Sequence, residues 1–250
     1  GCKHEREGSD PGAAQHVYRH AMDGGPSTLD PAKASNIYAN FLAVNLYDTL
    51  YRYKYLARPY RLEPNLADGL PQVSADGLIY TIRIKPGVHF IDDAAFPDGK
   101  GRAVRASDFV YSLKRHFDPA TRAQGAWLWQ GRIVGLDAWK ENGADYDEEV
   151  SGLRAVDDRT IQIQLISPFP QLTHTLAQGY SAIVPREAVE HYGPEFAVNP
   201  VGSGPYRLLS FNSSGAALER NPRFRQEPFS LEAEGYDPAR QEGLGLESLA

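Results

Sequence analysis

The stretch PVGSGPYRLLSF, residues 200–211, places a Gly-Ser-Gly turn directly before an apolar run. Two chemical interpretations of such a turn fail here. A phosphate-binding loop needs a helix after the glycines, usually with a lysine, whereas Pro205 follows Gly204 and a strand pattern comes next. A nucleophile elbow needs a glycine two residues before the serine, and Val201 stands there. We therefore interpret Gly202 and Gly204 as turn residues that can take positive φ and aim the strand.

Three segments carry the pattern of strands joined by turns. Residues 206–211 are followed by the turn residues NSSG and by AALERN, which predicts a strand, a turn and a second strand. Residues 78–90, LIYTIRIKPGVHF, alternate apolar with polar residues, and Pro86 and Gly87 suit a type II turn that returns VHF as a partner strand. Residues 152–166 predict another hairpin, whose turn contains two aspartates.

Two segments have the spacing of amphipathic helices. In residues 35–51, Ser35 or Asn36 can cap the first turn, and we expect one apolar ridge to pack on a large core. That ridge consists of Ile37, Phe41 and Val44. In residues 107–117, Ser107 can cap a helix whose inward side chains are Phe109, Val110, Leu113 and Phe117. Strands and helices therefore mix without a regular βαβ repeat.

Composition excludes several classes of function. The 250 residues carry a formal net charge of −6 and no basic stripe, so nucleic acid is not expected as a partner. A single cysteine permits no internal disulfide, and the seven histidines lack zinc-binding spacing. The aspartates of residues 91–102 depart from the spacing of a calcium loop, so we expect a solvated loop there. We expect no metal and no cofactor.

The N-terminal residues suggest an anchor. Cys2 follows Gly1, as at the processed end of a bacterial lipoprotein, and the polar residues behind it have no periodicity. We predict that residues 1–14 are a disordered tether and that Cys2 carries the lipid, which would be the only membrane attachment. The alternative is a cloning glycine beside an incidental cysteine.

Six spaced segments together resemble one family, the peptide and nickel class (family 5) of extracellular solute-binding proteins of ABC transporters. They occur in that family's order and cover most of the chain from Val17 to Phe224. The segments are STLDPAKA (27–34), VNLYDTLYRY (44–53), PNLADGLPQVSADGLIYTIRIKPGVHF (64–90), RAVRASDFVYSLKRHFDPAT (102–121), AVDDRTIQIQLISPFP (155–170) and NPVGSGPYRLLSF with ALERNPRF (199–224).

The resemblance implies a mixed α/β, type II periplasmic-binding-protein-like fold. Members of that family are about twice as long as this chain, so we expect most of lobe I and not the second lobe. Within lobe I we expect a core subdomain of residues 15–47 and 186–250 and an inserted subdomain of residues 48–185. In such proteins the Gly-Ser-Gly-Pro-Tyr turn is structural, and its serine is no nucleophile.

The resemblance also carries a set of ligand-facing residues. The loop and helix start after LDP correspond here to Ser35, Asn36, Ile37 and Tyr38, whose backbone groups can pair with an extended peptide whatever its side chains. The family's aromatic contact near DPAT falls ungapped on Gly125. Two tryptophans close to this glycine can substitute for the aromatic contact, or they can pack in the core. These are Trp127 and Trp129.

The function that follows is that of a periplasmic or cell-surface binding protein and not of an enzyme. The whole protein would capture peptides or similar small solutes by closing two lobes, and would deliver them to an ABC permease in the inner membrane. Nickel, haem, sugars and opines remain open as ligands. The alternatives are an envelope lipoprotein with an interaction role outside transport, and a secreted hydrolase, although no catalytic triad or carboxylate pair stands out.

Overall fold

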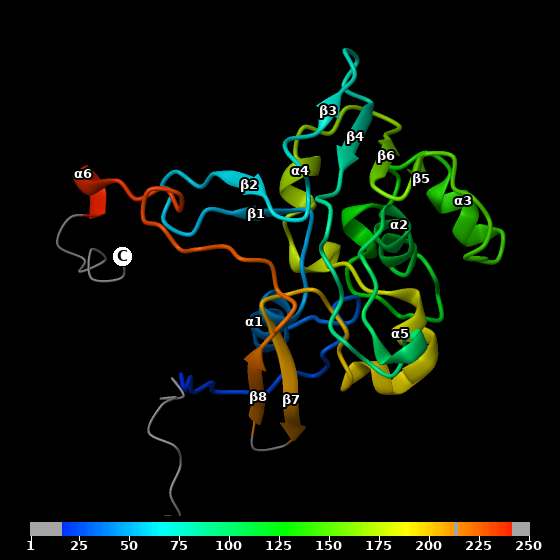
Figure 1. Cartoon of the computed structure of the whole chain (residues 1–250). Coiled ribbons are helices and arrows are strands. Elements are labelled where there is room, and N and C mark those ends of the chain that lie inside the picture. Colours follow the sequence, from blue (N-terminus) through cyan, green and yellow to red (C-terminus); the bar gives the residue numbers. More distant parts are fainter. Residues whose placement is uncertain (1–16, 213–214, 242–250) are drawn as a thin grey trace, which may run out of the picture.

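A computed structural model describes residues 17–212 and 215–241 (Figure 1). The predicted tether of residues 1–14, with Cys2, lies outside the described residues. The helices and strands follow in the order α1 (Ile37–Leu46), β1 (Tyr51–Tyr53), β2 (Leu62–Pro64), β3 (Gln72–Val73), β4 (Ile79–Arg83), η1 (Pro97–Gly99), α2 (Ala106–Lys114), η2 (Ala126–Leu128), α3 (Leu136–Glu141), β5 (Leu153–Ala155), β6 (Thr160–Gln164), α4 (Leu172–Thr175), η3 (Gly179–Ser181), α5 (Arg186–Tyr192), η4 (Gly193–Ala197), β7 (Tyr206–Asn212), β8 (Gly215–Arg220) and α6 (Pro238–Gln241).

A four-stranded antiparallel sheet in the order β3-β4-β6-β5 lies against α2. Ile82 of β4 pairs with Ile161 of β6, and the side chains of both are almost completely buried. The predicted hairpin of residues 152–166 is confirmed as β5 and β6, with Asp157 accepting a hydrogen bond from the Arg159 N–H at 2.8 Å in the turn. Burying one such side chain contributes about 1.5–3 kcal/mol, so this layer forms a large part of the core.

The predicted hairpin of residues 78–90 is only half right. Gly87 takes a φ of +75°, which fits the third position of the expected type II turn. The returning residues do not pair with β4, however. Instead, the Phe90 N–H donates to the Arg102 carbonyl at 3.1 Å, and the Val104 N–H donates to the Val88 carbonyl at 2.9 Å. Strand β4 already has β3 and β6 as neighbours, so the segment after the turn pairs further along the chain.

Helix α2 confirms the predicted helix but not its cap. Residue Ser107 lies inside the helix, and the Asp108 side chain accepts a hydrogen bond from the Arg105 N–H at 2.8 Å. Of the predicted inward side chains, Phe109, Leu113 and Phe117 are buried, and Val110 is partly buried against the core.

The expected solvated loop of residues 91–102 is tied to the body through its aspartates. Asp92 binds Lys100 at 2.9 Å and Arg223 at 2.5 Å, while Asp93 accepts a hydrogen bond from the Tyr192 hydroxyl at 2.9 Å. The prediction of a merely solvated loop is therefore wrong for these two aspartates, because partners distant in sequence hold them.

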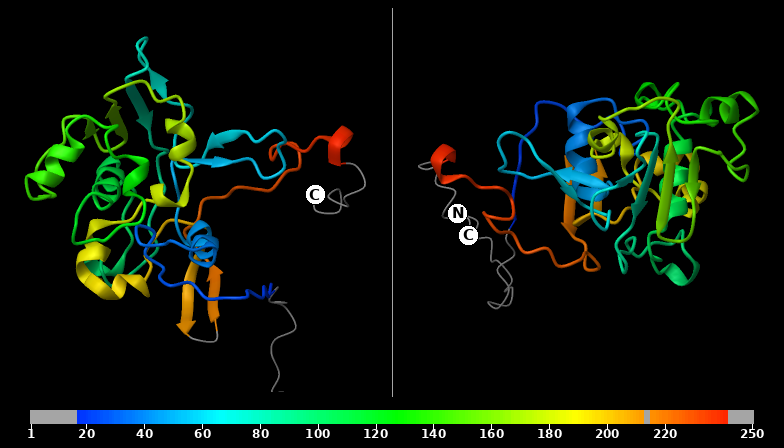
Figure 2. Two further views of the ribbon diagram at one scale, coloured as in Figure 1. Left: turned by 180° about the vertical axis from the view of Figure 1, so that it is seen from behind. Right: turned by 90° about the horizontal axis from the view of Figure 1, so that it is seen from above.

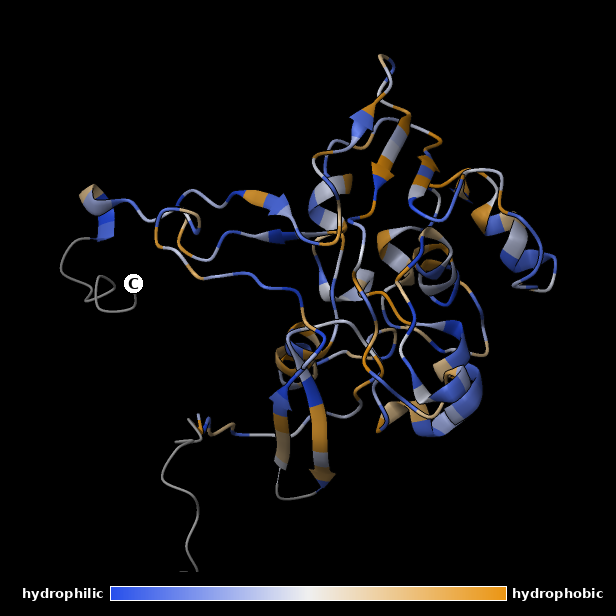
Figure 3. Ribbon diagram, in the orientation of Figure 1, coloured by the Kyte–Doolittle hydropathy of each residue, from blue (hydrophilic) through white to orange (hydrophobic). Residues whose placement is uncertain are grey.

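Helix α1 ends earlier than predicted and buries a different face. Its buried side chains are Ala39, Leu42, Ala43 and Leu46. The expected inward ridge is exposed instead, with exposed fractions of 75% for Ile37, 42% for Phe41 and 62% for Val44. Figure 3 colours α1 mainly as hydrophobic, and a helix that is apolar on several sides gives no periodic signal for the buried one.

The Gly-Ser-Gly turn runs against the end of α1 and leads into the predicted strand pair, β7 and β8. Neither Gly202 nor Gly204 takes positive φ, so that expectation is wrong. Glycine is required by close approach: a Cβ on Gly202 would lie 2.1 Å from the Leu46 carbonyl oxygen, and one on Gly204 would lie 2.7 Å from that of Asn45. The Gly204 N–H donates to the Leu46 carbonyl at 3.1 Å, which fixes this contact.

The β1–β2 hairpin and the segment that ends in α6 form an arm that projects from the body in both views of Figure 2. Arg52 of β1 joins the two parts of the arm, because it pairs with Glu63 of β2 at 2.7 Å and with Glu227 of the other part at 2.9 Å. Most of the buried apolar residues between Leu29 and Val201 form one hydrophobic core cluster. The predicted division into residues 15–47 with 186–250 and residues 48–185 stays a prediction.

Candidate ligand-binding face

The turn before α1 is fixed by a buried ion pair. Asp30 receives two hydrogen bonds from the Arg115 guanidinium, at 2.9 and 2.7 Å, and both side chains are at most 5% exposed. Asp30 also accepts a hydrogen bond from the Ala32 N–H at 3.1 Å. Because Arg115 directly follows α2, the pair joins the start of α1 to the body of the molecule.

The first turn of α1 presents unpaired backbone donors. Asn36 is the N-cap, and its side-chain oxygen accepts the Ala39 N–H at 2.8 Å. The N–H groups of Ser35, Asn36, Ile37 and Tyr38 donate to none of the described residues. A helix start leaves such groups open by geometry, and here Ser35 and Ile37 are also exposed. This surface can therefore donate hydrogen bonds to the carbonyl groups of a bound molecule.

The two candidate tryptophans lie in different environments. Trp127 is 65% exposed, whereas Trp129 is 1% exposed and belongs to the hydrophobic core. The Gln124 N–H donates to the Ala32 carbonyl at 2.9 Å, so the loop before Trp127 is bonded to the turn before α1. The structure thus brings the Trp127 segment and the start of α1 together, and it places the Trp129 ring in the interior.

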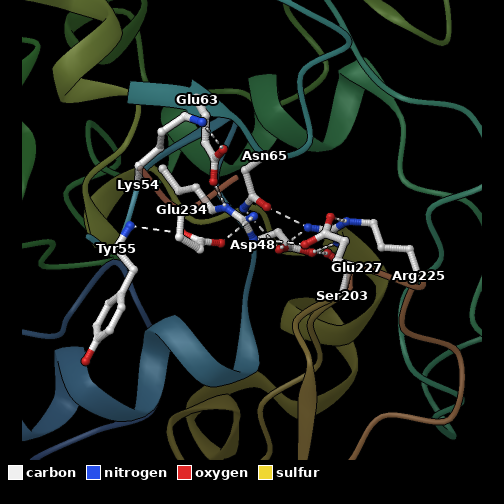
Figure 4. A network of polar contacts seen from close by, with 10 residues as sticks. Asp48, Lys54, Tyr55, Glu63, Asn65, Ser203, Arg225, Glu227 and Glu234 are labelled. Carbon is white, nitrogen blue, oxygen red and sulfur yellow. Dashed lines mark hydrogen bonds and ion pairs between the residues drawn. The ribbon is translucent and has the colours of Figure 1, made fainter. Parts of the chain in front are cut away.

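A buried acidic residue that the sequence interpretation missed organises the junction behind α1 (Figure 4). Asp48, which is 3% exposed, accepts hydrogen bonds from the Ser203 hydroxyl at 2.8 Å and the Asn65 amide at 3.1 Å. Arg225 pairs with the same carboxylate through two bonds, at 2.8 and 3.1 Å. A lone aspartate inside the apolar run LYDTLY was the available signal, since a buried carboxylate requires partners.

The Asp48 network gives Ser203 of the Gly-Ser-Gly turn a structural role. Ser203 is 1% exposed and donates its hydroxyl proton to Asp48. Beyond Arg225, Glu227 and Glu234 continue the network toward the arm, where Glu234 accepts the Tyr55 N–H at 2.9 Å (Figure 4). Ser203 is therefore a structural residue, and the network joins the end of α1, β2 and the segment after β8.

The described part of the chain offers no metal site and no membrane span. Within residues 17–212 and 215–241, no three His, Cys, Asp or Glu side chains gather closely enough to hold a metal ion. None of the helices in these ranges has the length and apolar character needed to cross a bilayer. The exposed features of the candidate face are backbone donors and aromatic side chains, which suit binding.

Solved structures share this fold. The murein tripeptide binding protein MppA of Escherichia coli is 28% identical, with a TM-score of 0.68 over 81% of this chain and 38% of that chain. The pheromone receptor PrgZ, described with its mode of peptide binding, is 26% identical, with a TM-score of 0.67 over 80% of this chain and 38% of that chain. Both of these solved proteins bind peptides according to their descriptions, and this chain has the fold of the corresponding part of each.

The family follows from the sequence match. The model of bacterial extracellular solute-binding proteins, family 5 Middle, matches residues 61–234, and the chain belongs to this family. The glutathione-binding protein GsiB of Pectobacterium atrosepticum is 28% identical over 188 residues, and GsiB of Escherichia coli strain K12 is 29% identical over 188 residues. The matched region is 75% of this chain and 31% of each relative, so the chain spans about a third of the length of these relatives.

Proposed function

We propose that this chain is most of lobe I of the solute-binding component of an ABC importer, and that the whole protein captures peptides or similar small solutes in the periplasm. The observation that carries the proposal is the set of open N–H groups on Ser35, Asn36, Ile37 and Tyr38 beside an exposed Trp127. An extended peptide has a row of carbonyl acceptors that match such donors without regard to its side chains.

Binding by backbone donors accounts for broad acceptance of peptides. Hydrogen bonds to the peptide main chain supply affinity, and an aromatic surface such as Trp127 supplies contact with one side chain. A second lobe that closes over the ligand would exclude water and strengthen these bonds, after which the permease would receive the solute. The relatives that bind glutathione, murein tripeptide and peptide pheromone favour short peptides over the other solutes of the family.

Lipid anchoring at Cys2 belongs to the same proposal. A protein that delivers solute to a permease gains from attachment beside the membrane, and the polar residues after Cys2 would act as the tether. Mass spectrometry of the native N-terminus tests this part separately. An unmodified Cys2, or a mature end at another residue, would reject the anchor and leave the binding proposal intact.

The binding proposal is tested by isothermal titration of the whole protein with a tripeptide library and with glutathione. We expect saturable binding, together with a change in tryptophan emission that is lost in Trp127→Ala. The matched control is Trp139→Phe, because Trp139 is 4% exposed and packs against Tyr146. Absence of binding to any library member and to glutathione would reject peptide capture. Binding with unchanged emission and affinity in Trp127→Ala would reject the placement of Trp127.

A further inference from the structure

Tyr180 lies between the two segments of the candidate face, which are the start of α1 and the loop that carries Trp127. It belongs to η3, which packs against α1, and a Cβ added to the preceding Gly179 would lie 3.1 Å from the Asn40 side-chain oxygen. On its other side, a Cβ added to Gly125 would lie 2.8 Å from Cδ1 of the Tyr180 ring. The backbone just before Tyr180 therefore lies against α1, and the Tyr180 ring lies against the loop that carries Trp127.

The backbone at Tyr180 is held from the interior by His116. The His116 Nε2 lies 2.7 Å from the Tyr180 carbonyl oxygen, which can only accept, so the proton resides on this nitrogen. The two rings also meet edge to face, with centroids 6.2 Å apart. Ser181 donates its hydroxyl proton to the Thr175 carbonyl at 2.8 Å. These contacts fix Tyr180 before any ligand arrives.

The exposed part of Tyr180 has unused binding capacity. Its side chain is partly buried, and none of the residues that the structure describes hydrogen-bonds its hydroxyl. A tyrosine in this position offers an apolar ring and a polar tip to the same ligand. We propose that Tyr180 is a specificity-determining contact of the peptide site, with its ring against a peptide side chain and its hydroxyl bonded to the peptide. This inference rests on the proposed function.

Gly125 is the residue that permits this arrangement. Besides Tyr180, a Cβ at this position would lie 2.9 Å from Cε1 and Nδ1 of the buried His116. Gly125 has a φ of −99° and a ψ of 2°, which other residues can adopt, so the constraint is steric and not conformational. A side chain at residue 125 would push the Tyr180 ring out of the position we assign to it.

The test uses the whole protein and isothermal titration with a tripeptide library and glutathione. Tyr180→Phe keeps the ring and its packing, so it should fold normally and weaken binding about threefold to tenfold through the lost hydrogen bond. Tyr180→Ala should weaken binding further and flatten the ranking of tripeptides by side chain. Gly125→Ala should also change that ranking. Tyr111→Phe is the matched control, because Tyr111 is partly buried on α2 and packs against Tyr146.

The outcomes separate this inference from the function on which it rests. If the unchanged protein binds tripeptides, and both Tyr180 variants keep its affinity and its ranking, Tyr180 is no ligand contact and the inference is overturned alone. If the unchanged protein binds neither tripeptides nor glutathione, the proposed function fails and this inference fails with it. A loss of affinity in Tyr180→Phe that Tyr111→Phe reproduces would also overturn the inference, because the effect would then not belong to the site.

Discussion

At the scale of single residues, Gly202 shows how one missing side chain lets two segments touch. Its carbonyl accepts the Ile91 N–H at 2.9 Å while its Cα faces the end of α1. A Cβ there would have to displace the backbone of Leu46, because the nearest atom is a main-chain oxygen and no flexible side chain can give way. The glycine is therefore required by packing.

We predict that Gly202→Ala lowers the free energy of unfolding by about 3 kcal/mol or more, through forced displacement of packed backbone. Gly25→Ala is the matched control, since a Cβ on Gly25 meets nothing within 4 Å. It should change the free energy of unfolding by less than about 0.5 kcal/mol. Urea denaturation of the three proteins provides the comparison. Similar midpoints for Gly202→Ala and Gly25→Ala would contradict the close contact seen here.

His116 makes a second prediction at this scale. Burial lowers the pKa of His116 from its usual range to about 4. The unfolded chain, with a normal histidine pKa of about 6.5, therefore binds more protons than the folded chain between pH 6.5 and pH 4. This histidine's contribution is present above pH 6.5 and is lost as the pH falls toward 4. The loss amounts to about 3 kcal/mol across that interval.

Thermal unfolding measured from pH 7 to pH 4.5 tests this contribution. We expect His116→Gln to be less stable than the unchanged protein at pH 7 but to lose less stability on acidification. His191→Gln is the control, because His191 is exposed on α5. If the stability of His116→Gln falls with pH as steeply as that of the unchanged protein, His116 is not the buried neutral group described here.

At the scale of elements, the Asp48 network joins parts of the chain that are far apart in sequence. Asp48 follows α1, Asn65 follows β2, and Arg225 follows β8. The Asp48 side chain is 4% exposed and the Arg225 side chain 16% exposed, and an ion pair that is largely buried is costly to break. The network therefore fixes how these elements meet, whatever its net contribution to stability.

We predict that Asp48→Asn lowers the free energy of unfolding by about 3 kcal/mol, because it removes the buried carboxylate charge that pairs with Arg225 and leaves Glu227 as the carboxylate partner of this arginine. Glu190→Gln is the control, since it removes an exposed i,i+4 pair with Arg186 and should cost at most about 0.5 kcal/mol. Urea denaturation measures both. Equal effects of the two substitutions would mean that the Asp48 pair is screened by solvent and does not organise the junction.

At the scale of the whole molecule, α1 has an exposed apolar ridge and the β7–β8 pair stands as a two-stranded sheet in the described structure. Phe41 and Val44 belong to that ridge. Exposed apolar patches and open strand edges promote association. The proposed second lobe would also supply one wall of the ligand site. The exposed ridge and the role of the proposed second lobe can both be tested by comparing residues 1–250 alone with the whole protein.

We predict that residues 1–250 alone bind tripeptides at least about a hundredfold more weakly than the whole protein, since contacts to one lobe would be lost and such polar contacts contribute about 2–5 kcal/mol. We also expect this fragment to associate with itself, and Phe41→Ser with Val44→Ser to reduce the association. Calorimetry measures the first effect and sedimentation the second. Equal affinities of fragment and whole protein would overturn two-lobe capture.

The sequence by itself determined the elements whose signal is local. Alternation predicted β4 and the β5–β6 hairpin, and the apolar spacing of residues 107–117 predicted α2, because each pattern follows from the geometry of one element. The order of the six motifs indicated the family. For the predicted site, the structure shows Asn36 as the N-cap of α1 and Trp127 as an exposed side chain. The ligand-binding roles of both residues stay predictions.

Only the tertiary structure decided which surfaces and partners each element uses. The apolar residues of α1 surround the helix, so periodicity could not tell that Leu42 is buried and Val44 exposed. Gly202 is a glycine because it contacts the backbone of Leu46, and Asp48 lies in the interior because it pairs with Arg225. The members of each pair are more than 150 residues apart in sequence. Tyr180 joins the candidate face through Gly125 and α1 in the same way. Contacts of this kind form between distant segments, and no local pattern in a single sequence records them.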